Sequence, residues 1–390
     1  MSRIGIIGGA LQGTEIAYLA KEAGLRTMMI DRRADAPALD LADEVVIMDI
    51  VKDRAAAREL LERCDAIIPA NENKRTLEAI VDICASMSTV LLFDPDAYRT
   101  TSSKIATNRM MRANSAPMPE EWPGCGFPVI VKPSGCSGSH GVSRVDRIED
   151  IPKGVEFARR YDDELVIQEF VSGPSISLEV IGKGNEAVSL QTTEVVLDEH
   201  YDCKMVLAPC ENRHYDEEGF KRVGVELGTA LELKGIMDVE AIVDDGVPKI
   251  LELDARFPSQ TPSAVLHSTG WNMLGIMYDW YVNDKSPKLS PGNIRQAIYE
   301  HVRVREGRLE SLGEDMMAEC SHLRMMTGLY GADVTLTDMR EGDSEWKATL
   351  ITTGRDKAEA WKRRQNVLDR IMDEHGITQW YDSEPGGGSR

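Results

Sequence analysis

The sequence predicts an α/β protein in which an open parallel-sheet domain comes first, followed by a small domain with a glycine-rich flap and by a C-terminal domain, the last two of α+β character. Three observations support this class. Strand-like and helix-like segments alternate through residues 1–93, as a parallel sheet requires. A loop rich in glycine and serine, residues 132–141, follows an apolar strand. Two further apolar runs, 236–243 and 249–253, carry acidic residues and are joined by a turn-forming sequence.

The first domain is expected to span residues 1–93. Short apolar runs predict its strands, and the longer stretches between them predict helices, the first of which ends at Gly24. The expected strands are Arg3–Ile7, Arg26–Ile30, Glu44–Met48, Ala66–Pro69 and Thr89–Phe93, and the expected helices are Thr14–Ala23, Arg54–Glu62 and Lys74–Met87.

Asp94-Pro95-Asp96 is expected to break this alternation and to open a second domain, 94–185, which a third domain, 186–390, follows. The end of the chain, 384–390, has the composition of a flexible segment. The elements expected in the second domain are the helix Ser102–Asn114 and the strands Val129–Lys132, Leu165–Phe170 and Ile176–Ile181, and those in the third include the strand Trp346–Thr352 and the helix Lys357–His375.

Composition excludes several classes of protein. The 390 residues carry a formal net charge of −20, which argues against nucleic acid as a partner. No apolar run is long enough to span a membrane, and the first strand leaves no room for a signal peptide. Seven cysteines without a C-x-x-C pair favour reduced thiols and a cytoplasmic location. The composition favours no particular oligomeric state.

The glycine-rich turn at residues 8–13 lies between a strand and a helix, and Asp31 ends the next strand. That layout is typical of dinucleotide-binding turns, in which an acid binds a ribose. The spacing differs, because Ala10 stands where the middle glycine of G-x-G-x-x-G belongs. A P-loop is excluded because Thr14, not lysine, follows Gly13. The turn still offers amides to a carboxylate or phosphate, or its glycines serve geometry alone.

Four carboxylates and one guanidinium are expected on one patch of the predicted hairpin. Strand side chains alternate faces, so Asp238 and Glu240 share a face of the first strand. Glu252, Asp254 and Arg256 share a face of the second. Packed carboxylates repel unless a cation neutralises them, and a set without His or Cys suits Mg²⁺. The arginine favours handling of a transferring phosphoryl group. The alternative is an edge hairpin with a solvated acidic face.

The loop after residue 132 has the composition of a phosphate-binding flap. Lys132 ends the preceding strand and can place its charge on phosphates. A mere connector is the alternative, but the acidic hairpin downstream favours an ATP site with a lid and metal ions. The flap residues expected to fold over phosphates are Ser134, Gly135, Ser137 and Gly138.

These features resemble, in their order along the chain, the ATP-grasp superfamily of carboxylate–amine ligases. The nucleotide-binding matches are Lys104, Lys132 and the adenine hinge Gln168, Glu169, Phe170 and Val171. The metal-binding matches are Glu240, Glu252 and Asp254. The resemblance implies the ATP-grasp fold, ATP, and two Mg²⁺ ions, with Glu252 and Arg256 acting in catalysis.

Two positions depart from the pattern of that superfamily. Its metal motif usually ends in asparagine, and Asp254 adds a negative charge there. Ser175 stands where many members place an acid for the ribose hydroxyls. Glu169 and Glu179 are therefore alternative candidates for the ribose contact.

Further stretches resemble the ligase family of pyrrolysine biosynthesis over residues 1–302, and the remainder resembles it only loosely. They are Gly8–Gly13, Asn71–Asn73, Tyr201–Val206, Leu233–Ile242, Glu252–Pro262 and Tyr299–His301. The resemblance implies that ATP activates (3R)-3-methyl-D-ornithine, or D-ornithine, as an acyl phosphate. The ε-amine of L-lysine then displaces phosphate and gives N6-(3-methyl-D-ornithyl)-L-lysine.

The substrate site is expected to be acidic and lined by hydroxyls, because an ornithine-like substrate brings two ammonium groups. Ser259 and Thr261 follow the metal strand, where a carboxylate awaiting phosphorylation would lie. Asp238 or Glu179 would assist deprotonation of the attacking amine, whose unperturbed pKa is about 10.4. The full set of candidates, each with a turn or surface role as its alternative, is Gln12, Glu72, Ser177, Glu179, Asp202, Met205, Asp238, Ser259 and Thr261.

Sequence position assigns some of these candidates more narrowly. Asp202 and Met205 are expected in a loop that bounds the lysine site. Ser177 and Glu179 share one side of a strand. Glu72 extends toward the site from the first domain or serves a helix N-terminus.

Two rival functions remain open at this point. Another ATP-grasp ligase, for other amino acids or a purine precursor, would keep the ATP residues and change the pocket. An NAD-dependent oxidoreductase would rest on residues 8–13 and Asp31 alone. ATP-dependent phosphate release distinguishes a ligase from the oxidoreductase.

Overall fold

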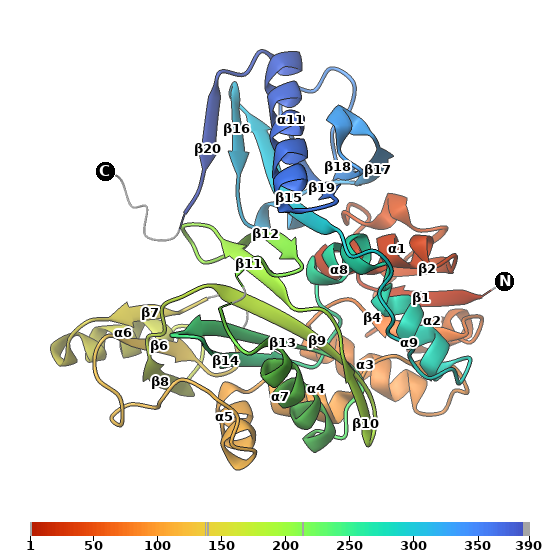
Figure 1. The fold of residues 1–390 in the computed structure, drawn as a ribbon. Coiled ribbons are helices and arrows are strands. Elements are labelled where there is room, and N and C mark those ends of the chain that lie inside the picture. Colours follow the sequence, from red (N-terminus) through yellow and green to blue (C-terminus); the bar gives the residue numbers. More distant parts are fainter. Residues whose placement is uncertain (1, 137, 139, 213, 385–390) are drawn as a thin grey trace. The chain divides into compact units, whose positions relative to one another are not determined.

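The structure is a computed structural model that describes residues 2–136, 138, 140–212 and 214–384 (Figure 1). The chain forms two compact units, and each is discontinuous in sequence. Unit 1 comprises Met1–Phe93, Val195–Glu211 and Phe257–Arg390, and unit 2 comprises Asp94–Glu194 and Asn212–Arg256. The division into three consecutive domains stays a prediction.

Unit 1 begins with the predicted parallel sheet, whose strand order is β3-β2-β1-β4-β5. The central strands are the most apolar, because helices cover both faces of such a sheet. The strands are β1 (Arg3–Ile7), β2 (Arg26–Asp31), β3 (Glu44–Ile47), β4 (Ala66–Pro69) and β5 (Val90–Leu91), and the helices between them are α1 (Leu11–Glu22), the 3₁₀ turn η1 (Leu39–Leu41), α2 (Arg54–Leu61) and α3 (Lys74–Cys84).

The rest of unit 1 contains an antiparallel sheet in the order β12-β15-β19-β18-β17. Helix α11 lies along β15 and β19 and buries Trp346, Leu368 and Ile371 there (Figure 1). The strands are β12 (Cys203–Ala208), β15 (Gln296–Arg305), β16 (Arg308–Ser311), β17 (Arg324–Thr327), β18 (Val334–Thr337), β19 (Trp346–Gly354) and β20 (Gln379–Asp382). The helices are α8 (Thr261–Thr269), α9 (Met273–Tyr281), α10 (Asp315–Ala318), η3 (Leu329–Gly331) and α11 (Lys357–His375).

Unit 2 contains two sheets, and the chain leaves it within β11 (Thr193–Leu197). The smaller sheet has the order β7-β6-β8, and the strands of the larger one pair as β14-β13-β9-β10. Helix α6 packs on the first sheet and α7 on the second. The strands are β6 (Val129–Pro133), β7 (Ser143–Val145), β8 (Leu165–Glu169), β9 (Ser175–Lys183), β10 (Glu186–Ser189), β13 (Lys234–Asp244) and β14 (Val247–Asp254). The helices are α4 (Pro95–Thr101), α5 (Lys104–Ala113), η2 (Ile148–Asp150), α6 (Ile151–Ala158) and α7 (Glu217–Ala230).

The parallel sheet ends with β5, and residues 94–96, where the alternation was expected to break, begin the first helix of unit 2. The Asp94 carboxylate accepts hydrogen bonds of 3.0 Å from the amides of Asp96 and Ala97 and so caps α4. Pro95 fits the first helical position, where no amide hydrogen bond is lost. Ser103 then caps α5, which places Lys104 at the first position of that helix.

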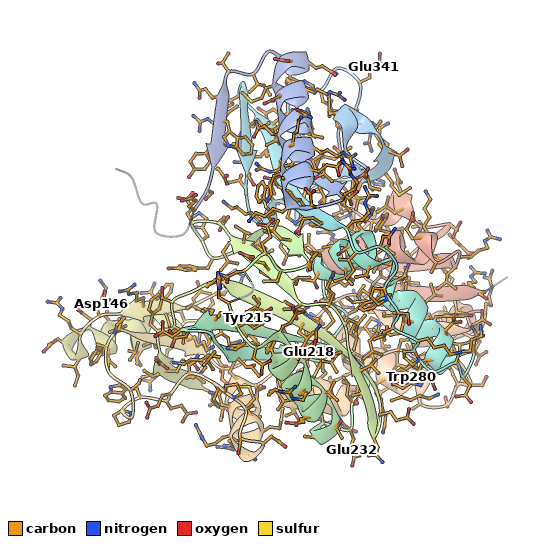
Figure 2. All side chains as sticks on the ribbon, in the orientation of Figure 1. Asp146, Tyr215, Glu218, Glu232, Trp280 and Glu341 are labelled. Carbon is orange, nitrogen blue, oxygen red and sulfur yellow. The ribbon has the colours of Figure 1, made fainter. Side chains whose placement is uncertain are left out.

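Surface and interior follow the composition. Figure 2 shows Glu218 of α7 and Glu232 just beyond it pointing away from the helix, in keeping with the acidic net charge. Trp280 of α9 is only 3% exposed and belongs to the core of unit 1. Among the helices that the structure describes, none combines the length and apolar character needed to cross a bilayer.

Candidate functional site

The acidic hairpin forms in unit 2 from β13 and β14, with the pairing that alternation predicts. Glu240 stands opposite Glu252, and Asp238 stands opposite Asp254. A β-bulge lies between Glu240 and Ala241 and changes the local twist. Side chains directly opposite each other have Cβ atoms only about 4.5–5.5 Å apart. The four carboxylates therefore share one face of the hairpin.

Repulsion and loss of hydration favour the protonated form of these carboxyls. Glu240 is exposed to solvent on one side, but the protein around its carboxyl group removes part of its hydration. This desolvation raises the pKa of Glu240 well above the usual value, and the negative charges of Asp238, Glu252 and Asp254 raise it further. Burial, followed by the neighbouring Glu179, raises the pKa of Asp238 as well. A cation among these oxygens would reverse both shifts. A donor set made only of oxygen fits Mg²⁺.

Arg256 extends the patch beyond the end of β14. Its Nη2 lies 3.1 Å from Oδ2 of Asp254. The amide of Ala255 donates to the Thr101 hydroxyl at 3.0 Å, which fixes the backbone between these two side chains. Among residues whose placement is described, no three His, Cys, Asp or Glu side chains are grouped so that they could hold a metal ion.

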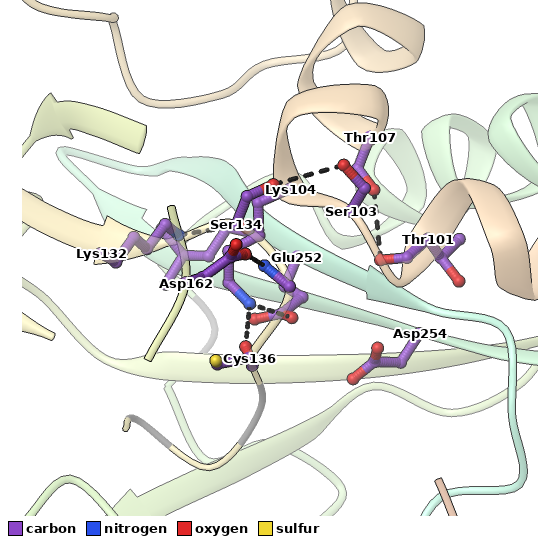
Figure 3. A network of polar contacts seen from close by, with 12 residues as sticks. Thr101, Ser103, Lys104, Thr107, Lys132, Ser134, Cys136, Asp162, Glu252 and Asp254 are labelled. Carbon is purple, nitrogen blue, oxygen red and sulfur yellow. Dashed lines mark hydrogen bonds and ion pairs between the residues drawn. The ribbon is translucent and has the colours of Figure 1, made fainter. Parts of the chain in front are cut away.

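Lys104 is the main partner of the acidic patch. It is 7% exposed, and its Nζ lies 2.7 Å from Oε1 of Glu252 and 2.5 Å from the carbonyl oxygen of Cys136 (Figure 3). Burial opposes the charged amine, but the carboxylates, Glu252 first, outweigh burial and raise the pKa of Lys104. The lysine thus stands where a cation is most favourable.

Lys132 lies at the end of β6, and its pKa is shifted in the opposite direction to that of Lys104. It is 7% exposed, and its Nζ lies 3.5 Å from the carbonyl oxygen of Leu251. Burial lowers its pKa to about 8; Glu252 opposes the shift and Lys104 adds to it. A bound phosphate would supply the negative charge that this ammonium lacks.

The flap residues after Lys132 are partly engaged with neighbouring backbone. The Ser134 hydroxyl accepts from the amide of Ile105 at 3.2 Å, and the Gly135 amide donates to Oδ2 of Asp162 at 2.7 Å. Gly138 has φ +65°, a conformation that favours glycine. Ser137 lies outside the described residues. The phosphate-binding role of this loop stays a prediction.

The hinge segment runs from the end of β8 toward β9. Gln168 is 3% exposed, and the Phe170 ring lies 4.3 Å from the guanidinium carbon of Arg144. Val171 is buried, and Ser175, the first residue of β9, pairs with Ile242.

The Glu169 carboxylate is half-buried and has several hydrogen-bond partners. Nζ of Lys249, on β14, lies 2.9 Å from each of its oxygens and 2.8 Å from Oδ2 of Asp244. The amide of Glu120 donates to the same carboxylate at 3.2 Å. These contacts engage Glu169, one of the candidates for the ribose, and Lys249 was not singled out from the sequence.

A buried hydroxyl joins two of the substrate candidates. Ser177 and Glu179 lie on β9, opposite Glu240 and Asp238 of β13. The Ser177 hydroxyl contacts Oε1 of Glu179 at 3.2 Å and is also hydrogen bonded to Oδ1 of Asp238. One hydroxyl hydrogen serves two carboxyl groups here, an arrangement that favours a further proton between them.

The remaining candidates lie in unit 1. Gln12 of α1 donates to Oε1 of Glu72 at 3.2 Å. Asp202 accepts from the amide of Asp315 at 2.9 Å, and burial raises the pKa of Asp202 to about 7, with Glu314 and other acids adding to the shift. Acidic groups thus surround Asp202, and the substrate roles of Gln12, Glu72 and Asp202 stay predictions.

The segment before α8 is strained. The Ser259 hydroxyl donates to Oε2 of Glu314 at 2.8 Å. Thr261, a residue that is 5% exposed, begins the helix. Among the described residues, its hydroxyl has no hydrogen-bond partner. Between them Gln260 has φ 71° and ψ −58°, and the amide of Thr261 donates to the carbonyl of Ser259 at 2.8 Å. This γ-turn with a left-handed residue is a costly conformation of the kind that functional sites retain.

The expected loop position of Met205 is wrong. Met205 lies in β12, is 3% exposed, and packs with Leu207, Ile298 and Ala360. The preceding Asp202 does lie outside the strand. An apolar run after Cys203 continues the strand and carries the methionine into the core.

Sequence reasoning also missed Glu15. This acid is 1% exposed in α1 and accepts from the amide of Ser263 at 2.6 Å, at the start of α8. Burial raises its pKa to about 7, against the hydrogen bonds from Ser263. Its signal in the sequence is a lone acid within the apolar stretch of the first helix.

The turn at residues 8–13 closes on itself. The Gly9 amide donates to Oδ2 of Asp31 at 2.7 Å, so the acid is engaged with the turn. A Cβ on Gly13 would lie 2.3 Å from the carbonyl oxygen of Gly8, so this glycine is needed for close packing. The geometry of the turn is sufficient to explain these glycines. The dinucleotide interpretation required the Asp31 carboxylate for a ribose, and here that carboxylate is bonded to the turn itself.

Two family models match the chain. The model described as PylC-like, N-terminal domain matches residues 4–90, and the model described as ATP-grasp domain matches residues 101–260. The second range contains the two lysines, the hinge and the acidic hairpin.

Curated relatives extend this similarity over nearly the whole chain. The 3-methyl-D-ornithine–L-lysine ligases of Methanosarcina barkeri and Methanosarcina acetivorans are each 32% identical to it, over 96% of this chain and 99% of the relative. A carbamoyl-phosphate synthase of Methanobrevibacter smithii is 26% identical over 67% of this chain and 75% of that protein.

Solved structures confirm the predicted ATP-grasp fold. The biotin carboxylase of Campylobacter jejuni matches with a TM-score of 0.73 at 15% identity, covering 95% of this chain and 91% of that chain. An N5-carboxyaminoimidazole ribonucleotide synthetase in complex with ADP matches with a TM-score of 0.70 at 16% identity, covering 96% and 98%. At this identity the likeness shows the fold alone.

Proposed function

This chain belongs to the family of 3-methyl-D-ornithine–L-lysine ligases, and we propose that it joins (3R)-3-methyl-D-ornithine to the ε-amine of L-lysine. ATP becomes ADP and phosphate, and the product, N6-(3-methyl-D-ornithyl)-L-lysine, serves pyrrolysine biosynthesis. The observation that carries the proposal is the 32% identity over 96% of the chain. ATP-grasp ligases in general bind ATP and Mg²⁺.

Unit 2 carries the residues suited to the phosphoryl transfer. A carboxylate oxygen of the ornithine substrate attacks the γ-phosphorus, the bond to ADP breaks, and an acyl phosphate results. Lys104 and Lys132 hold phosphate oxygens, and Arg256 stabilises charge on the transferring group. Two Mg²⁺ ions, when bound, neutralise phosphate charge. Their ligands would be Glu240, Glu252 and Asp254.

Amide formation requires loss of a proton from the lysine ε-ammonium. The amine nitrogen then attacks the acyl carbon, and phosphate leaves. Asp238 and Glu179 are the candidates to receive the proton, because the Ser177 hydroxyl bonds to both and can relay it. Their position on the strands beside Glu240 supports this role.

Recognition of the two amino acids is assigned to side chains with matching charge. Acidic groups suit the ammonium groups of both substrates, and Asp202 is assigned to L-lysine together with Gln12 and Glu72. Ser259 and Thr261 suit the carboxylate that is to be phosphorylated, because they offer hydroxyls at the N-terminus of α8.

The test is phosphate release from Mg-ATP with D-ornithine and L-lysine, with the amide followed by mass spectrometry. We expect release that depends on both amino acids and an ornithyl-lysine product. Turnover with other amino acids and silence with this pair would keep the ATP-grasp ligase and discard the assigned substrates. Absence of ATP turnover with every amine and acid would overturn the ligase assignment for this chain.

A further inference from the structure

Lys204, the second residue of β12 in unit 1, is a lysine with a buried charge. Lys204 is 3% exposed, and an unpaired charge at such a position is costly. Its acceptors come from the C-terminal segment: Nζ lies 2.6 Å from Oδ1 of Asp382 and also donates to the carbonyl oxygen of Ser383. The strand β12 is therefore joined to the end of β20 by charge-assisted hydrogen bonds.

The same C-terminal segment holds the loop 198–202, which precedes β12. The hydroxyl of Ser383, a residue 1% exposed, accepts from the amide of Glu199 at 3.0 Å. The Tyr381 hydroxyl donates to Oε1 of Glu199 at 3.0 Å. Both ends of this short loop are thus tied to β20, one through Glu199 and the other through Lys204.

The loop in turn sets the position of Asp202. Oδ1 of Asp198 accepts from the amides of His200 at 2.7 Å and Asp202 at 3.0 Å. Oδ2 of Asp198 accepts from the amide of Gly313 at 3.1 Å. A Cβ on Gly313 would lie 2.0 Å from the Asp202 carboxylate, so this carboxylate fits closely against the segment that follows β16. A displaced loop would move Asp202 out of that fit.

A second buried cation holds β20 from the side of α11. The Arg364 guanidinium lies 5.5 Å from the ring centroid of Trp380 and binds Glu300 through contacts of 2.6 Å and 2.5 Å. Glu300 is 1% exposed and stands opposite Met205 in the register of β12 and β15. The motif at residues 299–301, which the proposed reaction does not use, therefore contributes a buried acid that binds Arg364, the residue in contact with Trp380 of β20.

We propose that Lys204 is a positioning residue that forms, with Asp382 and Ser383, a latch holding Asp202 in place for the ammonium of the L-lysine substrate. The inference rests on the proposed function, which assigns Asp202 to that substrate. Lys204 is enclosed and directed at the C-terminal segment, so it acts through the loop. The latch gives the C-terminal strand, which lies outside both family-model matches, a role in substrate binding.

The test compares variants of the full-length protein. Asp382→Ala removes the carboxylate at the more accessible end of the latch, where side-chain exposure is 38%, and Lys204→Met removes the cation. Arg363→Met is the matched control, because Arg363 is another cation of unit 1 that bonds to a carboxylate, that of Asp333, and to backbone carbonyls, those of Thr353 and Gly331. Asp382→Asn keeps the acceptor oxygen and serves as the conservative rescue.

Two readouts are measured: KM values for L-lysine and ATP, and hydrogen exchange of the amides of residues 199–202. In Asp382→Ala we expect the KM for L-lysine to rise about tenfold, as loss of one charge-assisted hydrogen bond implies. We expect an unchanged KM for ATP, faster amide exchange, and recovery of most of both effects in Asp382→Asn. The Arg363→Met control should match the wild type.

Each alternative outcome overturns the latch. Faster exchange with an unchanged KM for L-lysine would show that loop order has no bearing on the substrate. A raised KM without faster exchange would exclude action through the loop. Equal rises in the KM for ATP and for L-lysine would indicate general damage. Failure of the proposed function would be seen in the wild type, as phosphate release that does not depend on L-lysine. In that case, hydrogen exchange of residues 199–202 still tests whether the latch orders the loop.

Discussion

Binding of ATP should draw a proton from solvent onto Lys132. Burial lowers the pKa of this lysine from 10.5 to about 8 in the protein without nucleotide. The difference corresponds to about 3.4 kcal/mol of lost preference for the charged form. Phosphate oxygens beside the ammonium favour that form and return the pKa toward its ordinary value. The sign is uptake, because Lys132 is partly neutral before binding and charged afterwards.

The size of the uptake follows from the pKa of about 8. About 0.03 proton per ATP is expected at pH 6.5, about 0.5 at pH 8 and about 0.9 at pH 9. The apparent Kd for ATP should rise about tenfold between pH 7 and pH 9, because the charged form becomes scarcer in the unbound protein. Magnesium-bound triphosphate does not titrate in this range, but Mg²⁺ would release protons from Asp238 and Glu240, whose pKa values are raised. The contribution of the lysine is therefore the difference between the wild type and a variant that lacks Lys132.

Calorimetry with a non-hydrolysable Mg-ATP analogue, in two buffers of different ionisation enthalpy, measures the protons taken up. Lys132→Met should lower the net proton uptake at pH 9 by about 0.9 proton and flatten the dependence of Kd on pH. Lys153→Met, which removes an exposed lysine from α6 of the same unit, is the control and should behave as the wild type. A difference below about 0.1 proton between the wild type and Lys132→Met at pH 9 would refute this reasoning.

Four further predictions follow from other contacts. Glu252→Gln should abolish trapping of the acyl phosphate by hydroxylamine while the melting temperature is kept, and near-normal turnover would contradict the metal assignment. Lys249→Met should raise the KM for ATP about tenfold, since Glu169 loses its partner; a rise confined to the amino acids would count against it. The KM for L-lysine should fall as pH rises through about 7, where Asp202 ionises, and Asp202→Asn should lose that step. Glu15 has a folded pKa of about 7 against 4.5 unfolded, so stability should fall from pH 4.5 to 7; thermal melts of Glu15→Gln should lack this slope.

Strand periodicity made the acidic hairpin predictable. Side chains alternate with a period of two, so the shared face of Asp238 and Glu240 follows from the sequence once the strand is identified. The turn between the strands then brings Glu252 opposite Glu240. The parallel sheet of residues 1–93 was predictable for a similar reason, because each strand is a short apolar run between longer helical stretches.

Contacts between distant segments were beyond the reach of periodicity. Lys104 and Glu252 are separated by 148 positions, and only the packing of α5 beside β14 brings them to 2.7 Å. Lys249 and Glu169 meet across two sheets in the same way. Met205 was misplaced because an apolar residue near a loop has no local signal that distinguishes a pocket wall from a core strand.

The pKa values of Lys104 and Lys132 are shifted in opposite directions because burial acts on both and only Lys104 has a carboxylate in contact with its ammonium group. Lys104 lies against Glu252, and the carboxylates outweigh burial and raise its pKa. At Lys132 burial dominates and lowers the pKa, with Glu252 opposing the shift and Lys104 adding to it. Lys104 is therefore the ammonium in contact with the acidic patch in the protein without ligands, and the charge of Lys132 is lost at lower pH than that of an ordinary lysine. Mg²⁺ at Glu252 would replace the ammonium of Lys104 there, and phosphate would favour the charged form of Lys132. The free energy of binding is therefore expected to be more favourable for metal and nucleotide together than for either alone. Binding of Mg²⁺ and ATP is thus expected to be mutually reinforcing through Glu252, without any change in the fold.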